Sequence, residues 1–196
     1  MLKAVPTSVG FRVKSGWAVA VLIEGPPATP KLVDVRRVQL SDPSVPKSAQ
    51  PHHVALRTPG AEGRTSTAML VKSVHDYGQA SVIALLEEYA AAGRRPACAA
   101  IVVGSQIDPA TIKNDHIRAH AEEGQLFRTV VASAVASTGM SQRISVEKRL
   151  YVEATTALGQ SEAAIRRVLV GLGRGVEGGW RSDEKSAALA AWMALA

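Results

Sequence analysis

The segment whose side chains are best suited to bind a ligand or catalyse a reaction runs from His116 through His120 to Glu123. Residues at positions i, i+4 and i+7 share one face of a helix, so these three side chains would form one polar stripe. When the apolar stripe of residues 127–135 is extended backwards at about 100° per residue, His116, His120 and Glu123 lie at the N-terminal end of that stripe. Their imidazole and carboxylate groups could hold a divalent metal, which would make the protein a metal-dependent hydrolase.

Two other interpretations of this segment are open. A helix N-terminus attracts anions, so His116 and Arg118 could bind a phosphate group. Alternatively, the histidines only hydrogen-bond to loop carbonyls and Glu123 only pairs with a cation. The HExxH motif is excluded, because Ile117 stands where its general-base glutamate should be. The two consecutive histidines, His52 and His53, could add a ligand or have no chemical role.

Two further motifs have ordinary explanations. The stretch from Gly173 to Gly178 formally matches GxGxxG, but a helix is expected before it and none directly after it. That context favours a flexible glycine-rich loop over 171–181 rather than a dinucleotide site. Cys98 is the only cysteine and lies in an apolar segment, so we expect an inert thiol and no internal disulfide.

The composition is that of a globular protein with a basic surface. The 196 residues are 46% hydrophobic and 20% charged, so we expect a single domain over 1–196. The net charge of +6 suits DNA or RNA as a partner, although it could also simply solubilise the surface. Neither a membrane-spanning run nor a signal peptide is recognisable, so we expect a cytoplasmic protein without a membrane partner.

The hydrophobic pattern predicts an α/β fold that follows a short disordered tail over 1–9. Alternating or continuous apolar residues indicate strands, and residues with helical spacing between capping residues indicate helices. The expected strands are 11–23, 32–40, 51–57, 97–103 and 143–152. The expected helices run from Thr65 or Ser66 to Ala92, from Asp115 to Gly139, over 161–172, and from Ser182 to the C-terminus.

This order of elements resembles the ribonuclease H-like superfold and, within it, the RuvC-type Holliday junction resolvases. Residues 11–21, FRVKSGWAVAV, are similar to that family's first strand, and SDEKSAALAAWMAL near the C-terminus is similar to its last helix. The resemblance implies a mixed sheet, made of a three-strand meander plus two parallel strands, flanked by helices. It also implies a nucleic-acid partner.

The resemblance further implies a nuclease site in which carboxylates hold two divalent metals, and this chain departs from it. Lys14 stands at the position of the first-strand aspartate, and Val102 or Val103 at that of the central-strand glutamate. Glu184 fits one acidic position of the last helix, while Ala187 stands at the other. We therefore expect a degenerate site with no cofactor, in a protein that associates with nucleic acid or has a structural or assembly role.

Lys14 has a second possible role at that position. It could neutralise a phosphate or form an ion pair with Asp183 or Glu184, and we expect it within salt-bridge reach of one of them. These three residues form the predicted catalytic-site remnant at one edge of the sheet. The residues expected to bind substrate or an anion there are Ser15, Ser105, His116, Arg118 and His120.

Overall fold

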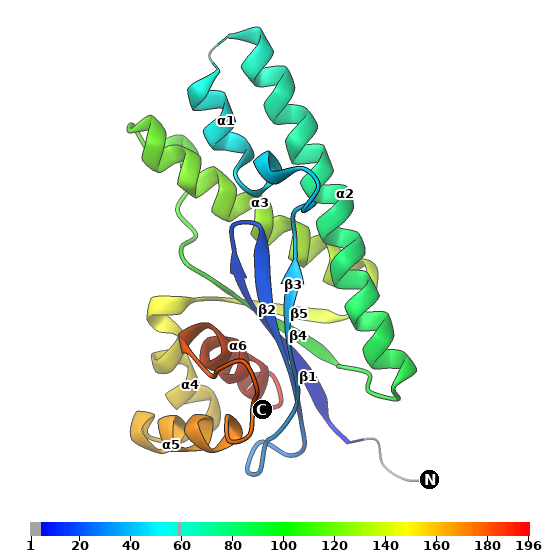
Figure 1. Cartoon of the computed structure of the whole chain (residues 1–196). Coiled ribbons are helices and arrows are strands. Elements are labelled where there is room, and N and C mark those ends of the chain that lie inside the picture. The colour runs from blue at the N-terminus through cyan, green and yellow to red at the C-terminus, as the bar shows by residue number, and fades with distance from the viewer. Residues whose placement is uncertain (1–4, 59) are drawn as a thin grey trace.

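A computed structural model describes residues 5–58 and 60–196 and contains one mixed sheet. The strands are β1 (Thr7–Lys14), β2 (Trp17–Glu24), β3 (Lys31–Gln39), β4 (Cys98–Val103) and β5 (Ser141–Val146). Their order across the sheet is β3-β2-β1-β4-β5 (Figure 1). The first three strands are antiparallel, whereas β4 and β5 run parallel to β1. The expected meander plus two parallel strands is confirmed.

Helices cover both faces of this sheet. They are α1 (Pro51–Arg57), α2 (Ala61–Ala91), α3 (Asp115–Ser137), α4 (Leu150–Leu158), α5 (Glu162–Leu172) and α6 (Ser182–Met193). One apolar core lies between the sheet and α2 and α3, and a second lies between the opposite face and α4, α5 and α6 (Figure 1). The helix α1 and the adjoining ends of α2 and α3 extend past the sheet (Figure 1). Within the described residues, no helix is both long and apolar enough to cross a bilayer.

The segment 11–23, expected as one strand, is instead the centre of a hairpin. β1 and β2 pair from Thr7 with Glu24 to Lys14 with Trp17. The turn contains Gly16, whose φ of +82° glycine adopts without steric cost. Residues 7–9 are buried strand rather than disordered tail, and residues 1–4 of that predicted tail lie outside the described part. The turn was missed because side-chain alternation runs through both strands.

Two other expected strands are partly or wholly helical. Residues 51–57 form α1, which begins at Pro51, because a proline in the first turn suits a helix. β5 ends at Val146, and a short 3-10 turn leads into α4. Leu150 and Ala154 are buried with helical spacing while Val152 is 69% exposed, which is incompatible with a half-buried strand.

The N-termini of α2 and α3 differ from the predicted ones. α2 begins at Ala61, before the expected cap at Thr65 or Ser66. Asn114, not Asp115, caps α3 by accepting a hydrogen bond from the backbone N–H of Ile117 at 3.0 Å. The predicted cap of α5 is confirmed, since the Ser161 hydroxyl accepts from the Ala164 N–H.

The packing of α6 on β1 fixes the position of the site. A Cβ on Gly10 would lie 1.9 Å from the carbonyl oxygen of Ala187, so only glycine permits this close approach. Two residues earlier, the Ser8 hydroxyl donates to the Ala191 carbonyl at 2.5 Å. Two residues along a strand advance about 6.6 Å and four along a helix about 6 Å, so the contacts continue in register. The next residues of β1 on this face therefore meet the first turn of α6.

Candidate functional site

A cleft of about 250 Å³ opens where the parallel strands β1 and β4 end. In α/β sheets, ligands usually bind at the carboxyl ends of such strands. The cleft is formed by the ends of β1 and β4, the residues that follow them, and one face of α3. Its lining includes Arg12, Lys14, Ser15, Ser105, His120 and Arg128, and no carboxylate is among the described residues that line it. The cleft is therefore suited to an anion.

Beside the cleft, two cations of β1 meet two carboxylates. The Lys14 ammonium lies 3.1 Å from Oδ1 of Asp183, and the Nε of Arg12 lies 3.5 Å from the same oxygen. Arg12 also forms an ion pair with Glu147 and donates to the Val13 carbonyl at 2.9 Å. This charge cluster, which consists of Arg12, Lys14, Glu147 and Asp183, draws its members from three separate segments of the chain.

Glu147 and Arg12 are the two members of the charge cluster that the sequence analysis did not predict, and a sequence signal was available for Arg12. Its side chain is only 3% exposed, and an arginine that is so well buried is normally paired. The available signal was its position two residues before Lys14, which places both on one face of the strand. Lys14 is 36% exposed and faces the cleft, so it is the more accessible cation.

The two acidic residues expected near Lys14 behave differently. Asp183 makes the expected contact, whereas Glu184 is not part of the charge cluster. The Glu184 carboxylate instead accepts a hydrogen bond from the backbone N–H of Arg181 at 2.8 Å, at the start of α6. Its position in the first turn explains this role, because it can fold back onto the free backbone donors there.

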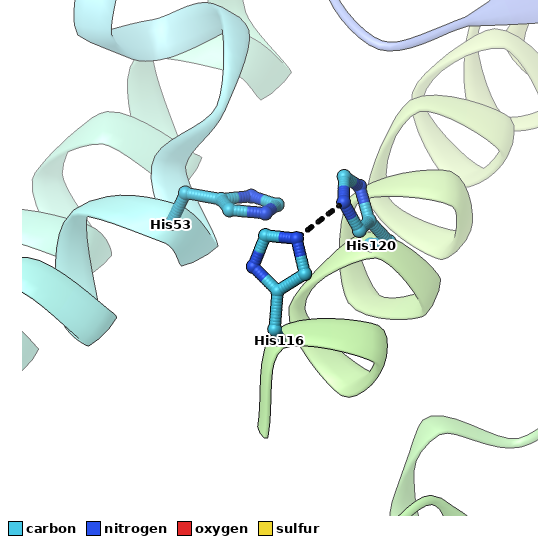
Figure 2. Close-up of side chains that lie close together, drawn as sticks. All are labelled: His53, His116 and His120. Carbon is cyan, nitrogen blue, oxygen red and sulfur yellow. Dashed lines mark hydrogen bonds between the residues drawn. The ribbon is translucent and has the colours of Figure 1, made fainter. Parts of the chain in front are cut away.

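Three histidines form a second group, which adjoins the cleft through His120. Figure 2 shows that His53 from α1 converges with His116 and His120 from α3. Glu123, expected beside the last two as a ligand, is instead fully buried, and its Oε1 lies 2.8 Å from Nδ1 of His53. His116 and His120 are exposed rather than core-facing, because this end of α3 extends past the sheet.

The remaining predicted residues are separated by the fold. Ser15 and Ser105 line the cleft, and the Ser105 carbonyl accepts from Arg128 at 3.4 Å. Arg118 does not line it, since its guanidinium pairs with Asp115 at 2.6 Å. The expected phosphate site of His116 and Arg118 thus lacks a free guanidinium.

The glycine-rich loop packs closely at Gly173. A Cβ on Gly173 would lie 2.2 Å from the indole of Trp180, whose Nε1–H donates to the Leu169 carbonyl at 2.7 Å. The loop therefore folds back onto the end of α5. This geometry agrees with the rejection of a dinucleotide site.

No protein-family model and no curated protein sequence matches the chain. Comparison with solved structures shows that the chain has the ribonuclease H-like fold of RuvC. Thermus thermophilus RuvC in complex with Holliday junction substrate is similar with a TM-score of 0.56 and 13% identity, over 96% of this chain and 91% of that one. A second structure of Thermus thermophilus RuvC is similar with a TM-score of 0.55 and 13% identity, over 95% and 92%. The likeness concerns the fold.

Proposed function

We propose that the protein binds the phosphate backbone of nucleic acid in the cleft at the ends of β1 and β4, without two-metal nuclease chemistry. The observation that carries this proposal is the lining of the cleft, in which Arg12, Lys14 and Arg128 supply cations and no described lining residue is acidic. Lysine and arginine that neutralise phosphates release counterions, which supplies most of the sequence-independent affinity for nucleic acid.

Two of these cations are available to a ligand. Lys14 is 36% exposed, and its carboxylate partner, Asp183, is shared with Arg12. Arg128 is half-buried and makes one long hydrogen bond to the Ser105 carbonyl. Arg12 is buried and paired, so we assign it to holding the carboxylates rather than to the ligand.

The residues at the end of β1 do not fit two divalent metals. Two-metal catalysis needs carboxylates that converge on the ions. Here Asp183 and Glu147 are engaged by Arg12 and Lys14, whose positive charges would repel a cation from the same place. This charge cluster supports the degenerate site inferred from the sequence, with the ion pairs in place of metal.

The choice of nucleic acid follows from the structural comparison. The RuvC structure of similar fold was solved with a Holliday junction substrate, so a four-way DNA junction is the first ligand to test. Binding through phosphates predicts weaker discrimination between branched DNA, duplex DNA and RNA than base contacts would give.

Fluorescence anisotropy with a labelled four-way junction, a duplex and an RNA strand tests the proposal. Binding should weaken steeply as salt rises, and Lys14→Gln and Arg128→Gln should each weaken binding to all three and lower the salt slope by about one. Lys31→Gln is the matched control, because Lys31 is exposed at the opposite end of the sheet. Absence of binding at low salt, or wild-type binding by both cleft variants, would disprove the proposed interface.

Incubation of the junction with Mg²⁺ or Mn²⁺ tests the second half of the proposal. The junction should remain intact. Cleavage that disappears in Asp183→Asn would show that the site is an active nuclease.

A further inference from the structure

We propose that His53, His116 and His120 form a binding site for one divalent transition-metal ion, best suited to Zn²⁺, which ties α1 to α3. This three-histidine site is separate from the charge cluster at the end of β1. It does not depend on the proposed nucleic-acid binding.

The geometry of the three rings is close to that of a metal site. The candidate ligand nitrogens lie within 4.8 Å of one another, and Nε2 of His116 lies 3.2 Å from Nε2 of His120. Two nitrogens at about 2.0–2.1 Å from a tetrahedral Zn²⁺ are about 3.3 Å apart. His116 and His120 already have this spacing, and the ring of His53 points toward them (Figure 2).

The rings do not satisfy one another without an ion. A neutral imidazole has one N–H and one lone pair, so two facing Nε2 atoms can share a single hydrogen. The centroid of the His53 ring lies 4.4 Å from that of His120 and 5.0 Å from that of His116, in edge-on arrangements. No described hydrogen bond joins the His53 ring to the other two. A metal ion would use all three lone pairs at once.

Glu123 provides the independent observation that points to a cation. Its side chain is 0% exposed, Oε1 lies 2.8 Å from Nδ1 of His53, and Oε2 has no described hydrogen-bond partner. Metal-binding histidines commonly donate their second ring N–H to a carboxylate, which fixes the tautomer and leaves the other nitrogen free. With Nδ1 held by Glu123, Nε2 is the free nitrogen of His53. A cation on that nitrogen would also compensate the buried carboxylate.

The donor set determines the kind of ion and its surroundings. Three imidazoles favour Zn²⁺ and similar transition metals over Mg²⁺ or Ca²⁺, which prefer oxygen ligands. His116 and His120 are exposed, so the fourth coordination position faces solvent and accepts water. Because α1 has only seven residues, an ion that links it to α3 would stabilise a helix too short to persist alone.

Equilibrium dialysis of chelator-treated protein against Zn²⁺, with metal analysis, tests the site. We expect one ion per chain, a higher melting temperature with Zn²⁺, and the visible absorption of tetrahedral Co²⁺ when Co²⁺ is used. His116→Ala and His120→Ala should each lower the affinity at least tenfold, and Glu123→Gln by about 10–100-fold. His52→Ala and His75→Ala, which change the two histidines outside the site, are the matched controls and should bind like wild type.

Three outcomes would overturn the proposal. One is the absence of stoichiometric binding of both Zn²⁺ and Co²⁺. Another is wild-type affinity for Zn²⁺ in both His116→Ala and His120→Ala. The third is undiminished affinity in a His53→Ala variant that is folded by circular dichroism, which would reduce the site to a surface histidine pair.

Discussion

The Lys14 ammonium lies 3.1 Å from Oδ1 of Asp183, at the point where the first turn of α6 reaches the end of β1. The pair continues the contacts made further down by Ser8 with Ala191 and by Gly10 with Ala187. Asp183 also forms an ion pair with Arg12, so one carboxylate contacts two cations. The ion pair is thus part of the packing of α6 on the sheet as well as of the candidate site.

The two cations of this charge cluster should contribute unequally to stability. Lys14→Ala should cost about 1 kcal/mol or less, because Lys14 is 36% exposed and Asp183 keeps Arg12 as a partner. Arg12→Ala should cost about 2 kcal/mol or more, because it removes a buried stem and a partner of both carboxylates. Urea denaturation measures both free energies of unfolding, with Lys31→Ala as the exposed control. Equal costs would show that Arg12 does not organise the charge cluster.

Gly10→Ala should destabilise the protein by about 1–3 kcal/mol or more, because the added methyl group would meet the backbone of α6 at 1.9 Å. Gly124→Ala is the contrasting variant. Gly124 lies within α3, and a Cβ added there would meet no atom within 4 Å. Alanine should therefore add about 0.5–1 kcal/mol of stability, because glycine loses more conformational freedom in a helix. Thermal denaturation compares the two. A neutral Gly10→Ala would contradict the close approach of α6 to β1.

Tyr89 should titrate only when the protein unfolds in alkali. Its ring is 3% exposed and its hydroxyl donates to Asp34 at 2.9 Å, so burial, and then the Asp34 charge, raise the pKa of the phenol well above its ordinary value. A raised folded-state pKa contributes stability that is fully present below the unfolded pKa of about 10 and is lost as the pH rises above it.

The tyrosinate absorbance measures this behaviour directly. Of the three tyrosines, one should ionise late and together with the loss of secondary structure, and Tyr89→Phe should remove that late step. Reversible ionisation of all three in the folded protein would contradict the raised pKa of Tyr89.

Several features followed from local sequence alone. The apolar run at 97–103 predicted a buried parallel strand, because only a strand covered on both faces is apolar throughout, and it is β4. The cap at Ser161 predicted the start of α5, because capping depends on neighbouring residues. The proximity of Lys14 to Asp183 or Glu184 was predicted from the family resemblance rather than from local sequence, and Asp183 is the partner found.

Other features depended on tertiary contacts. Alternation was continuous through the turn at Gly16, so one long strand and a hairpin had the same pattern. Residues 51–57 became helix because they pack on α2 and α3, and only that packing brings His53 to His116 and His120. The apolar stripe of α3 places Glu123 and His120 on one face of the helix. Glu123 is buried where it contacts His53 of α1, whereas His120 is exposed. Residue spacing determines which side chains share a face, whereas what covers that face is decided by elements distant in the chain.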